Sequence, residues 1–216
     1  WISYRILTLI SLLHQITKSM IHGAINPDNV FVTWDLNVSI GDMAPFKPTY
    51  IKYNRPDLFH HFFTTASRGG CYLAPKQLIT SDSETDNVIF MFGSFSMDFF
   101  AAGLVIYYLY TGEHLLSFST LAEIALALRK SKIKNEADYD ENDPNASKTT
   151  KPPDNKDYDL IFDKYIYEKI KVLPDDIRDL VKILLDLDPS RRLSEQSIID
   201  NGMSAENFAN NSYDDI

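Results

Sequence analysis

Apolar residues recur at helical spacing in several stretches of the chain. From Trp1 to about Ser19 they form one stripe, which predicts an amphipathic helix with one buried face. From Ser96 to Thr111 the chain is apolar on nearly every side and then meets Gly112, which predicts a central buried helix that stops at the glycine. The same spacing predicts three more helices, at 120–130, at 174–187 with Pro174 in its first turn, and after Ser194, which can cap a last short helix.

The segment between the first two helices has a different pattern. Val30–Val32 and Val38–Ile40 are short β-branched runs on either side of a turn at Asp35–Asn37, which predicts a β-hairpin. The residues before it, His22–Asn29, include Gly, Pro, Asn and Asp and predict a loop. Asp42–Lys76 has no sustained period, so we expect a long ordered loop, and loops of that length inside a compact domain are usually functional.

The second half contains one strongly polar stretch. Residues 134–158 consist mostly of Asp, Asn, Lys and Pro, a composition that buries too little apolar surface to order itself. We therefore predict one folded unit over residues 1–204 with a disordered acidic insertion at 134–158, followed by a polar tail at 205–216. Because the chain begins at Trp1 and not at a methionine, we expect it to be a piece of a longer protein.

Composition narrows the function classes. A net charge of −9 argues against nucleic-acid binding, which relies on Lys and Arg. Cys71 is the single cysteine, so an internal disulfide is excluded and a reducing, cytoplasmic compartment with a packed thiol is favoured. The apolar run at Phe99–Tyr110 falls short of the roughly 20 residues that a membrane-spanning helix needs. Nothing at the N-terminus resembles a signal peptide.

The segment from His22 to Asn29 carries most of the functional information. Its spacing resembles the catalytic loop of protein kinases, in which an Asp accepts the substrate proton, a Lys neutralises phosphate and an Asn binds metal, with a second metal-binding Asp after the next hairpin. On that resemblance the base position is Ala24 and the lysine position is Asn26, while Asn29 and Asp42 keep the metal and cofactor positions. Met43 and Ala44 stand where Phe-Gly usually follows.

Three more kinase landmarks follow in order, and they complete the predicted fold class. Ala74-Pro75-Lys76 matches the end of an activation segment, and Arg192 belongs to an Asp-Pro-x-x-Arg motif. Asp98-Phe99-Phe100-Ala101-Ala102-Gly103 opens the apolar helix, as in the kinase pattern Asp-x-aromatic-Ser-x-Gly. We predict a mainly α protein-kinase C-lobe with a small β-hairpin at the catalytic loop and no N-lobe. Kinases pair a Glu at the position of Lys76 with the Arg of the last motif, so we expect Arg192 to find another acid or to turn to solvent.

A closer resemblance covers Trp1 to Pro75. The run Phe46-Lys47-Pro48-Thr49-Tyr50, which ordinary kinases lack, is similar to the kinase-like domain of the regulatory subunit of class III phosphatidylinositol 3-kinase, the vacuolar protein sorting kinase fifteen family. The resemblance implies a scaffold that binds the lipid-kinase catalytic subunit on endosomal and autophagic membranes. It also implies an N-lobe, helical repeats, a propeller and a myristoyl anchor outside this chain, so membrane contact would be indirect. Other residues that carry it are Trp1-Ile2, His22-Gly23, Trp34, Phe62-Phe63, Thr65 and Cys71-Tyr72.

We therefore predict a pseudokinase that serves as a regulatory module, since both Asp and Lys of the family's loop are replaced. The alternative is an active ATP-dependent serine/threonine kinase with a displaced base, because Asn29 and Asp42 leave ATP and Mg²⁺ binding possible in the full-length protein. A third possibility is a kinase-like scaffold unrelated to lipid kinases. A metal hydrolase built on His60-His61 is disfavoured, since no carboxylate lies at ligand spacing.

Overall fold

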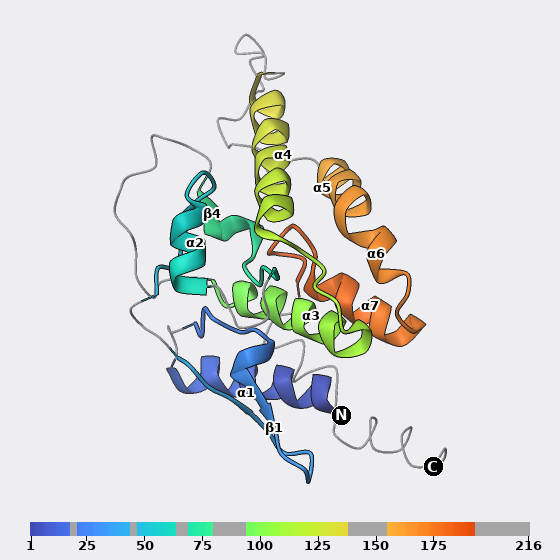
Figure 1. Cartoon of the computed structure of the whole chain (residues 1–216). Coiled ribbons are helices and arrows are strands. Elements are labelled where there is room, and N and C mark those ends of the chain that lie inside the picture. Colours follow the sequence, from blue (N-terminus) through green and yellow to red (C-terminus); the bar gives the residue numbers. More distant parts are fainter. Residues whose placement is uncertain (18–20, 44–46, 64–68, 80–93, 138–154, 193–216) are drawn as a thin grey trace.

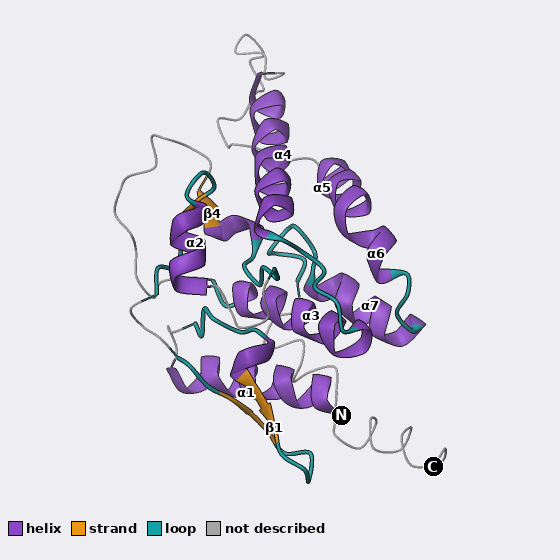
Figure 2. Ribbon diagram, viewed as in Figure 1, coloured by secondary structure: helices purple, strands orange, loops and turns teal. Residues whose placement is uncertain are grey.

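The fold is mostly helical, as Figure 2 shows, and its strands are short. The computed structural model describes residues 1–17, 21–43, 47–63, 69–79, 94–137 and 155–192. Within these ranges the strands form two separate two-stranded sheets, one antiparallel and one parallel. The mainly α class predicted from the sequence pattern is confirmed.

Helix α3, Ser96–Thr111, lies at the centre of the fold (Figure 1). Its apolar residues are buried on several sides, and it ends as predicted at Gly112, which adopts the left-handed φ of 70° and donates its N–H to Tyr108 O. Helices α1, Ile2–Thr17, and α7, Asp175–Leu184, both pack against α3. The apolar faces of α1 and α7 therefore pack against α3 and form one hydrophobic core with it.

The predicted hairpin is present with its predicted bounds. Strands β1, Val30–Val32, and β2, Val38–Ile40, pair antiparallel, with Phe31 opposite Ser39. The loop before it ends in a single 3₁₀ turn, η1, Pro27–Asn29. The hairpin contacts α1, so the loop and both strands are held on the same side of the core.

The segment Asp42–Lys76 contains more regular structure than the sequence pattern predicts. Helix α2, Pro56–Phe63, lies within it, and strand β3, Ile51–Lys52, pairs in parallel with β4, Leu78–Ile79. Helix α2 is only eight residues long, too short for periodicity to reveal it, and a distant contact holds it, since the ring of Phe59 stacks 4.7 Å from that of Phe118. The turn η2, Pro75–Gln77, separates this segment from β4.

Both ends of the insertion predicted at 134–158 are helical, which corrects its bounds. Helix α4 spans Phe118–Ala137 and helix α5 spans Asn155–Phe162, so residues 134–137 and 155–158 are helical. The predicted helix at 120–130 is thus longer at both ends. Residues 138–154, the helix predicted after Ser194 and the polar tail at 205–216 lie outside the described residues. After α5 the chain continues through a π-helical turn, η3, Asp163–Tyr167, into α6, Glu168–Ile170.

None of the helices in the described ranges is both long and apolar enough to cross a bilayer. The apolar run noted in the sequence belongs to α3, whose sixteen residues are surrounded by other helices.

Candidate functional site

Asp98 holds the loop that follows α1 in place. It lies in the first turn of α3 and is 1% exposed. Its carboxylate accepts hydrogen bonds from the backbone N–H of His22 at 2.7 Å and of Gly23 at 2.9 Å. The Nε2 of His14, on α1, lies 2.9 Å from the same carboxylate. One buried side chain therefore joins two helices to the loop that carries the candidate chemistry.

His22 connects the start of the loop to the end of the hairpin. Its Nε2 lies 2.9 Å from Gly41 O, a carbonyl that can only accept, so Nε2 carries the proton. Its Nδ1 then accepts the N–H of Ala24 at 3.3 Å. Burial lowers the pKa of His22, although nearby Asp98 opposes the shift. The imidazole is therefore a neutral structural link.

The two positions where kinases place their base and cation carry neither group. Ala24 is 6% exposed and offers only a methyl group, while its carbonyl accepts both the Asn26 amide at 2.9 Å and the Asn29 amide at 2.8 Å. The Oδ1 of Asn26 accepts the N–H of Asp28 at 2.9 Å and so caps η1. These hydrogen bonds hold the backbone of the loop, but the two positions supply no proton acceptor and no positive charge.

The side chains of Asn29 and Asp42 lie next to each other in the fold. The Asn29 amide nitrogen lies 3.3 Å from Asp42 Oδ2, and Asp42 has a φ of 61°, which a non-glycine residue rarely adopts. Lys47 donates to the same Oδ2 at 2.6 Å. That hydrogen bond is the main cause of the lowered pKa of Asp42, and partial burial opposes it. Met43, next to Asp42, is 40% exposed, and Ala44 lies outside the described residues.

The oxygen atoms of an Asn–Asp pair are suitable ligands for Mg²⁺. In the described part of the chain, however, no group of three or more His, Cys, Asp or Glu side chains is arranged to hold a metal ion. The carboxylate of Asp42 is also already paired with an ammonium group. The side-chain oxygen atoms therefore suit a divalent cation, but the positive charge of Lys47 beside Asp42 opposes its binding.

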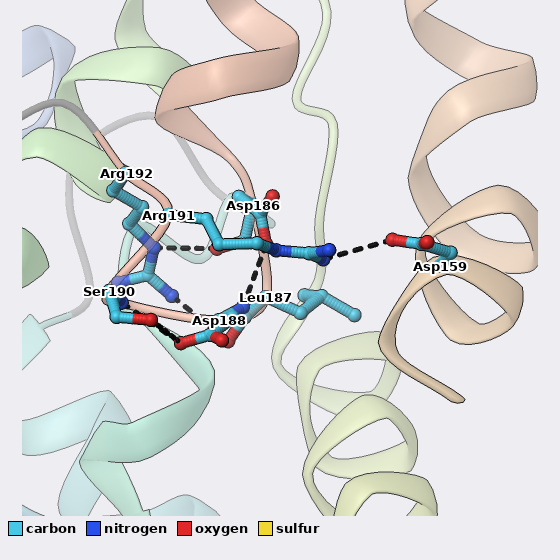
Figure 3. Close-up of polar contacts among 7 residues, drawn as sticks. All are labelled: Asp159, Asp186, Leu187, Asp188, Ser190, Arg191 and Arg192. Carbon is cyan, nitrogen blue, oxygen red and sulfur yellow. Dashed lines mark hydrogen bonds and ion pairs between the residues drawn. The ribbon is translucent and has the colours of Figure 1, made fainter. Parts of the chain in front are cut away.

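Arg192 differs from its prediction, since it is buried and, within the described residues, forms no ion pair with a carboxylate, although the charges of Asp186 and Asp188 favour its protonated form. It is 5% exposed and donates to the carbonyl oxygens of Asp186 at 2.6 Å and Leu187 at 3.5 Å (Figure 3). It also donates to the carbonyl oxygen of Ser96 at 3.0 Å. Its guanidinium also lies 4.8 Å from the centre of the Phe100 ring. Burial lowers its pKa to about 10, which still leaves it charged at neutral pH. Backbone carbonyls have replaced the missing carboxylate.

Lys76, at the position of the missing kinase Glu, is exposed and faces a different acid. Burial tends to raise the pKa of Asp188, but the Ser190 N–H and hydroxyl, with Arg191 and Lys76, lower it overall. Arg191 reaches outward to Asp186 at 3.0 Å and to Asp159 on α5 at 2.9 Å (Figure 3). The reversed charge at Lys76 is therefore balanced by the loop after α7 without a contact to Arg192.

The run Phe46–Tyr50 is tied to the motif Ala74-Pro75-Lys76 through Gln77. The Gln77 amide donates to Thr49 O at 3.1 Å, and its Oε1 accepts the N–H of Ala74 at 2.8 Å. Phe46 itself lies outside the described residues. Cys71 is 2% exposed, which confirms the predicted packed cysteine, and burial raises its pKa to about 12.

Spacing alone did not reveal three functional contacts of this site. Lys47 belongs to the run Phe46–Tyr50, and nothing in that run indicates that its ammonium contacts Asp42. His14 carries no sequence signal beyond a polar residue within a helical stripe, and Gln77 follows its motif as an unremarked polar residue. Each acts through a partner that only the folded chain brings near.

The helical lobe, the hairpin and a loop anchored by His22 and Asp98 define a protein-kinase-like domain, in its helical C-lobe region. No protein-family model matches the chain. The chain is 26% identical over 200 residues to the putative serine/threonine-protein kinase VPS15 of Komagataella pastoris, covering 90% of this chain and 12% of that protein. It is 29% identical over 205 residues to the VPS15 kinase of Arabidopsis thaliana, covering 93% and 11%.

A shorter match, 34% identical over 107 residues, links it to the probable VPS15 kinase of Dictyostelium discoideum, covering 48% of this chain and 5% of that protein. The chain is therefore a homologue of the VPS15 serine/threonine-protein kinases. It spans no more than 12% of the length of these curated relatives.

Proposed function

We propose that the chain is a pseudokinase module, a non-catalytic part of a larger regulatory protein. The observation that carries this proposal is Ala24, whose methyl group stands at the base position of a loop that several hydrogen bonds hold in place. The loop keeps an ordered structure although it lacks the catalytic base. This favours a structural role for the site over a catalytic one. Asn26 supports the same conclusion, because its side chain caps η1 and carries no charge.

The size of the expected loss supports the proposal. A general base contributes about 10²- to 10⁴-fold in rate, and a positioned cation that neutralises developing charge contributes about 10²- to 10³-fold. Both groups are absent here, so we expect phosphotransfer to be strongly suppressed.

The wider role we propose is that of the regulatory subunit of a class III phosphatidylinositol 3-kinase complex. It would be cytoplasmic and peripheral on endosomal or autophagic membranes, and its membrane contact would come from regions outside this chain. Support comes from the homology to proteins named VPS15 and from the run Phe46–Tyr50, whose described part packs against Gln77.

The proposal is tested by restoring the missing groups in the full-length protein. We expect Ala24→Asp with Asn26→Lys, made together with Lys47→Met so that Asp42 is not paired with an ammonium group, to give measurable transfer of γ-phosphate from ATP to a protein substrate, and the unaltered protein to give none above background. A matched control, Ala24→Asn with Asn26→Gln in the same Lys47→Met protein, keeps similar side-chain sizes without either charge and should stay inactive. Equal transfer by the unaltered and the restored proteins would contradict the pseudokinase assignment.

The second candidate is an active ATP-dependent serine/threonine kinase with a displaced base, and one observation favours it. Asn29 and Asp42 lie within 3.3 Å of each other, as metal-binding partners would. In that case ATP and Mg²⁺ would bind in the full-length protein, and exposed Asp28 is the carboxylate that follows the loop's base position most closely. A thermal shift that requires both nucleotide and Mg²⁺, together with transfer by the unaltered protein that Asp28→Asn abolishes, would favour this candidate.

A further inference from the structure

The contact between Lys47 and Asp42 is unusual for a candidate metal position. The Lys47 ammonium lies 2.6 Å from Asp42 Oδ2, and the Lys47 side chain is only 15% exposed, whereas that of Asp42 is 50% exposed. The lysine is therefore folded down onto the site and not extended into solvent. A hydrogen bond between two charged groups at this distance is among the stronger kinds in proteins.

Asn29 completes the surroundings of the same oxygen. Its amide nitrogen is identified by the 2.8 Å contact with the Ala24 carbonyl, which can only accept. That nitrogen also points at Asp42 Oδ2, 3.3 Å away. Two donors thus converge on one carboxylate oxygen, and one of them carries a full positive charge.

The ion pair with Lys47 weakens the attraction of Asp42 for a divalent cation. Mg²⁺ needs carboxylate oxygens at about 2.0–2.1 Å in near-octahedral geometry. At Asp42 it would have to displace the Lys47 ammonium or bind beside it, and two cations a few ångströms apart repel each other. The negative charge that would attract the metal is already neutralised from within the chain.

We propose that Lys47 is an internal cation that takes the place of a divalent metal at Asp42 and so suppresses metal binding at this site. The proposal goes beyond the scaffold role and does not depend on any partner. In this proposal Lys47 neutralises Asp42, so that Asn29 and Asp42 stay in contact without a metal ion.

The test is a Mn²⁺ titration of the purified protein, followed by the electron paramagnetic resonance signal of free Mn²⁺. Lys47→Met keeps the aliphatic length and removes the charge, and we expect it to bind Mn²⁺ about tenfold or more tightly than the unaltered protein. Lys47→Arg keeps the charge and should behave as the unaltered protein does. Adding Asp42→Asn to Lys47→Met should abolish the gained binding.

Equal Mn²⁺ affinity of the unaltered protein and Lys47→Met would overturn the proposal, and so would a gain that survives Asp42→Asn. Asp42→Asn alone provides a test that does not require Lys47→Met to fold. It should leave the weak Mn²⁺ binding of the unaltered protein unchanged, whereas a loss would show that Asp42 binds metal despite Lys47. Because the titration involves neither phosphotransfer nor a partner, its failure would leave the proposed function untouched.

Discussion

At the scale of single residues, Asp98 contributes most to the shape of the site. It is buried, it accepts two backbone N–H groups of the loop, and it lies 2.9 Å from His14. Removing the Asp98 carboxylate leaves the buried N–H groups of His22 and Gly23 without their acceptor, which is costly. The loop geometry around Ala24 therefore depends on a residue far away in sequence.

We expect Asp98→Ala to lower the free energy of unfolding by about 3–5 kcal/mol. Chemical denaturation followed by circular dichroism would measure the change. Asp57→Ala is the control, because Asp57 pairs with Arg55 on an exposed surface and its loss should change the free energy of unfolding far less. A similar small cost at Asp98 would show that the cluster is not needed for folding.

At the scale of elements, the packing of α3 against α7 depends on one small residue. A Cβ added at Gly103 would lie 2.9 Å from Leu184 Cβ and 2.9 Å from Leu185 Cδ2. Distances this short do not occur between well-packed carbons, so the two helices would have to separate. The glycine is required here by close approach, since its φ is not in the left-handed region.

Gly103→Ala is expected to destabilise the protein by about 1–3 kcal/mol through overpacking. The double variant with Leu185→Ala tests the cause, because removing the facing side chain should make the two effects less than additive. Thermal unfolding of the four proteins in this cycle gives the coupling free energy. Strict additivity would mean that the cost at Gly103 arises elsewhere.

At the scale of the whole molecule, we propose that the chain is one part of a longer regulatory protein. Its length covers at most 12% of the curated relatives. A scaffold binds partners through its surface, and such binding does not require the base or the cation that Ala24 and Asn26 have replaced.

We expect the tagged full-length protein to co-purify with a class III phosphatidylinositol 3-kinase catalytic subunit, identified by mass spectrometry. The Ala24→Asp, Asn26→Lys variant should recover the same amount, because the proposed role is not catalytic. Recovery of other partners without any lipid kinase would instead favour a scaffold unrelated to lipid kinases.

Local patterns were enough to predict the elements whose stability is local. The hairpin at 30–40 and the helix at 96–111 follow from β-branched runs, a turn and a left-handed glycine, all close in sequence. Helix α2 and the full extents of α4 and α5 were missed, because they are short or polar and depend on contacts such as Phe59 with Phe118. A residue's secondary structure is predictable when its neighbours along the chain decide it.

The sequence by itself determined which groups the site has and lacks, since the spacing of His22, Ala24, Asn26, Asn29 and Asp42 is a property of the chain. Only the tertiary structure decided how the charges are balanced. Arg192 bonds to carbonyl oxygens where an acid was expected, and Lys47 neutralises Asp42 where a metal was considered. Charge pairing depends on distances of a few ångströms between atoms, and those distances exist only once the chain has folded.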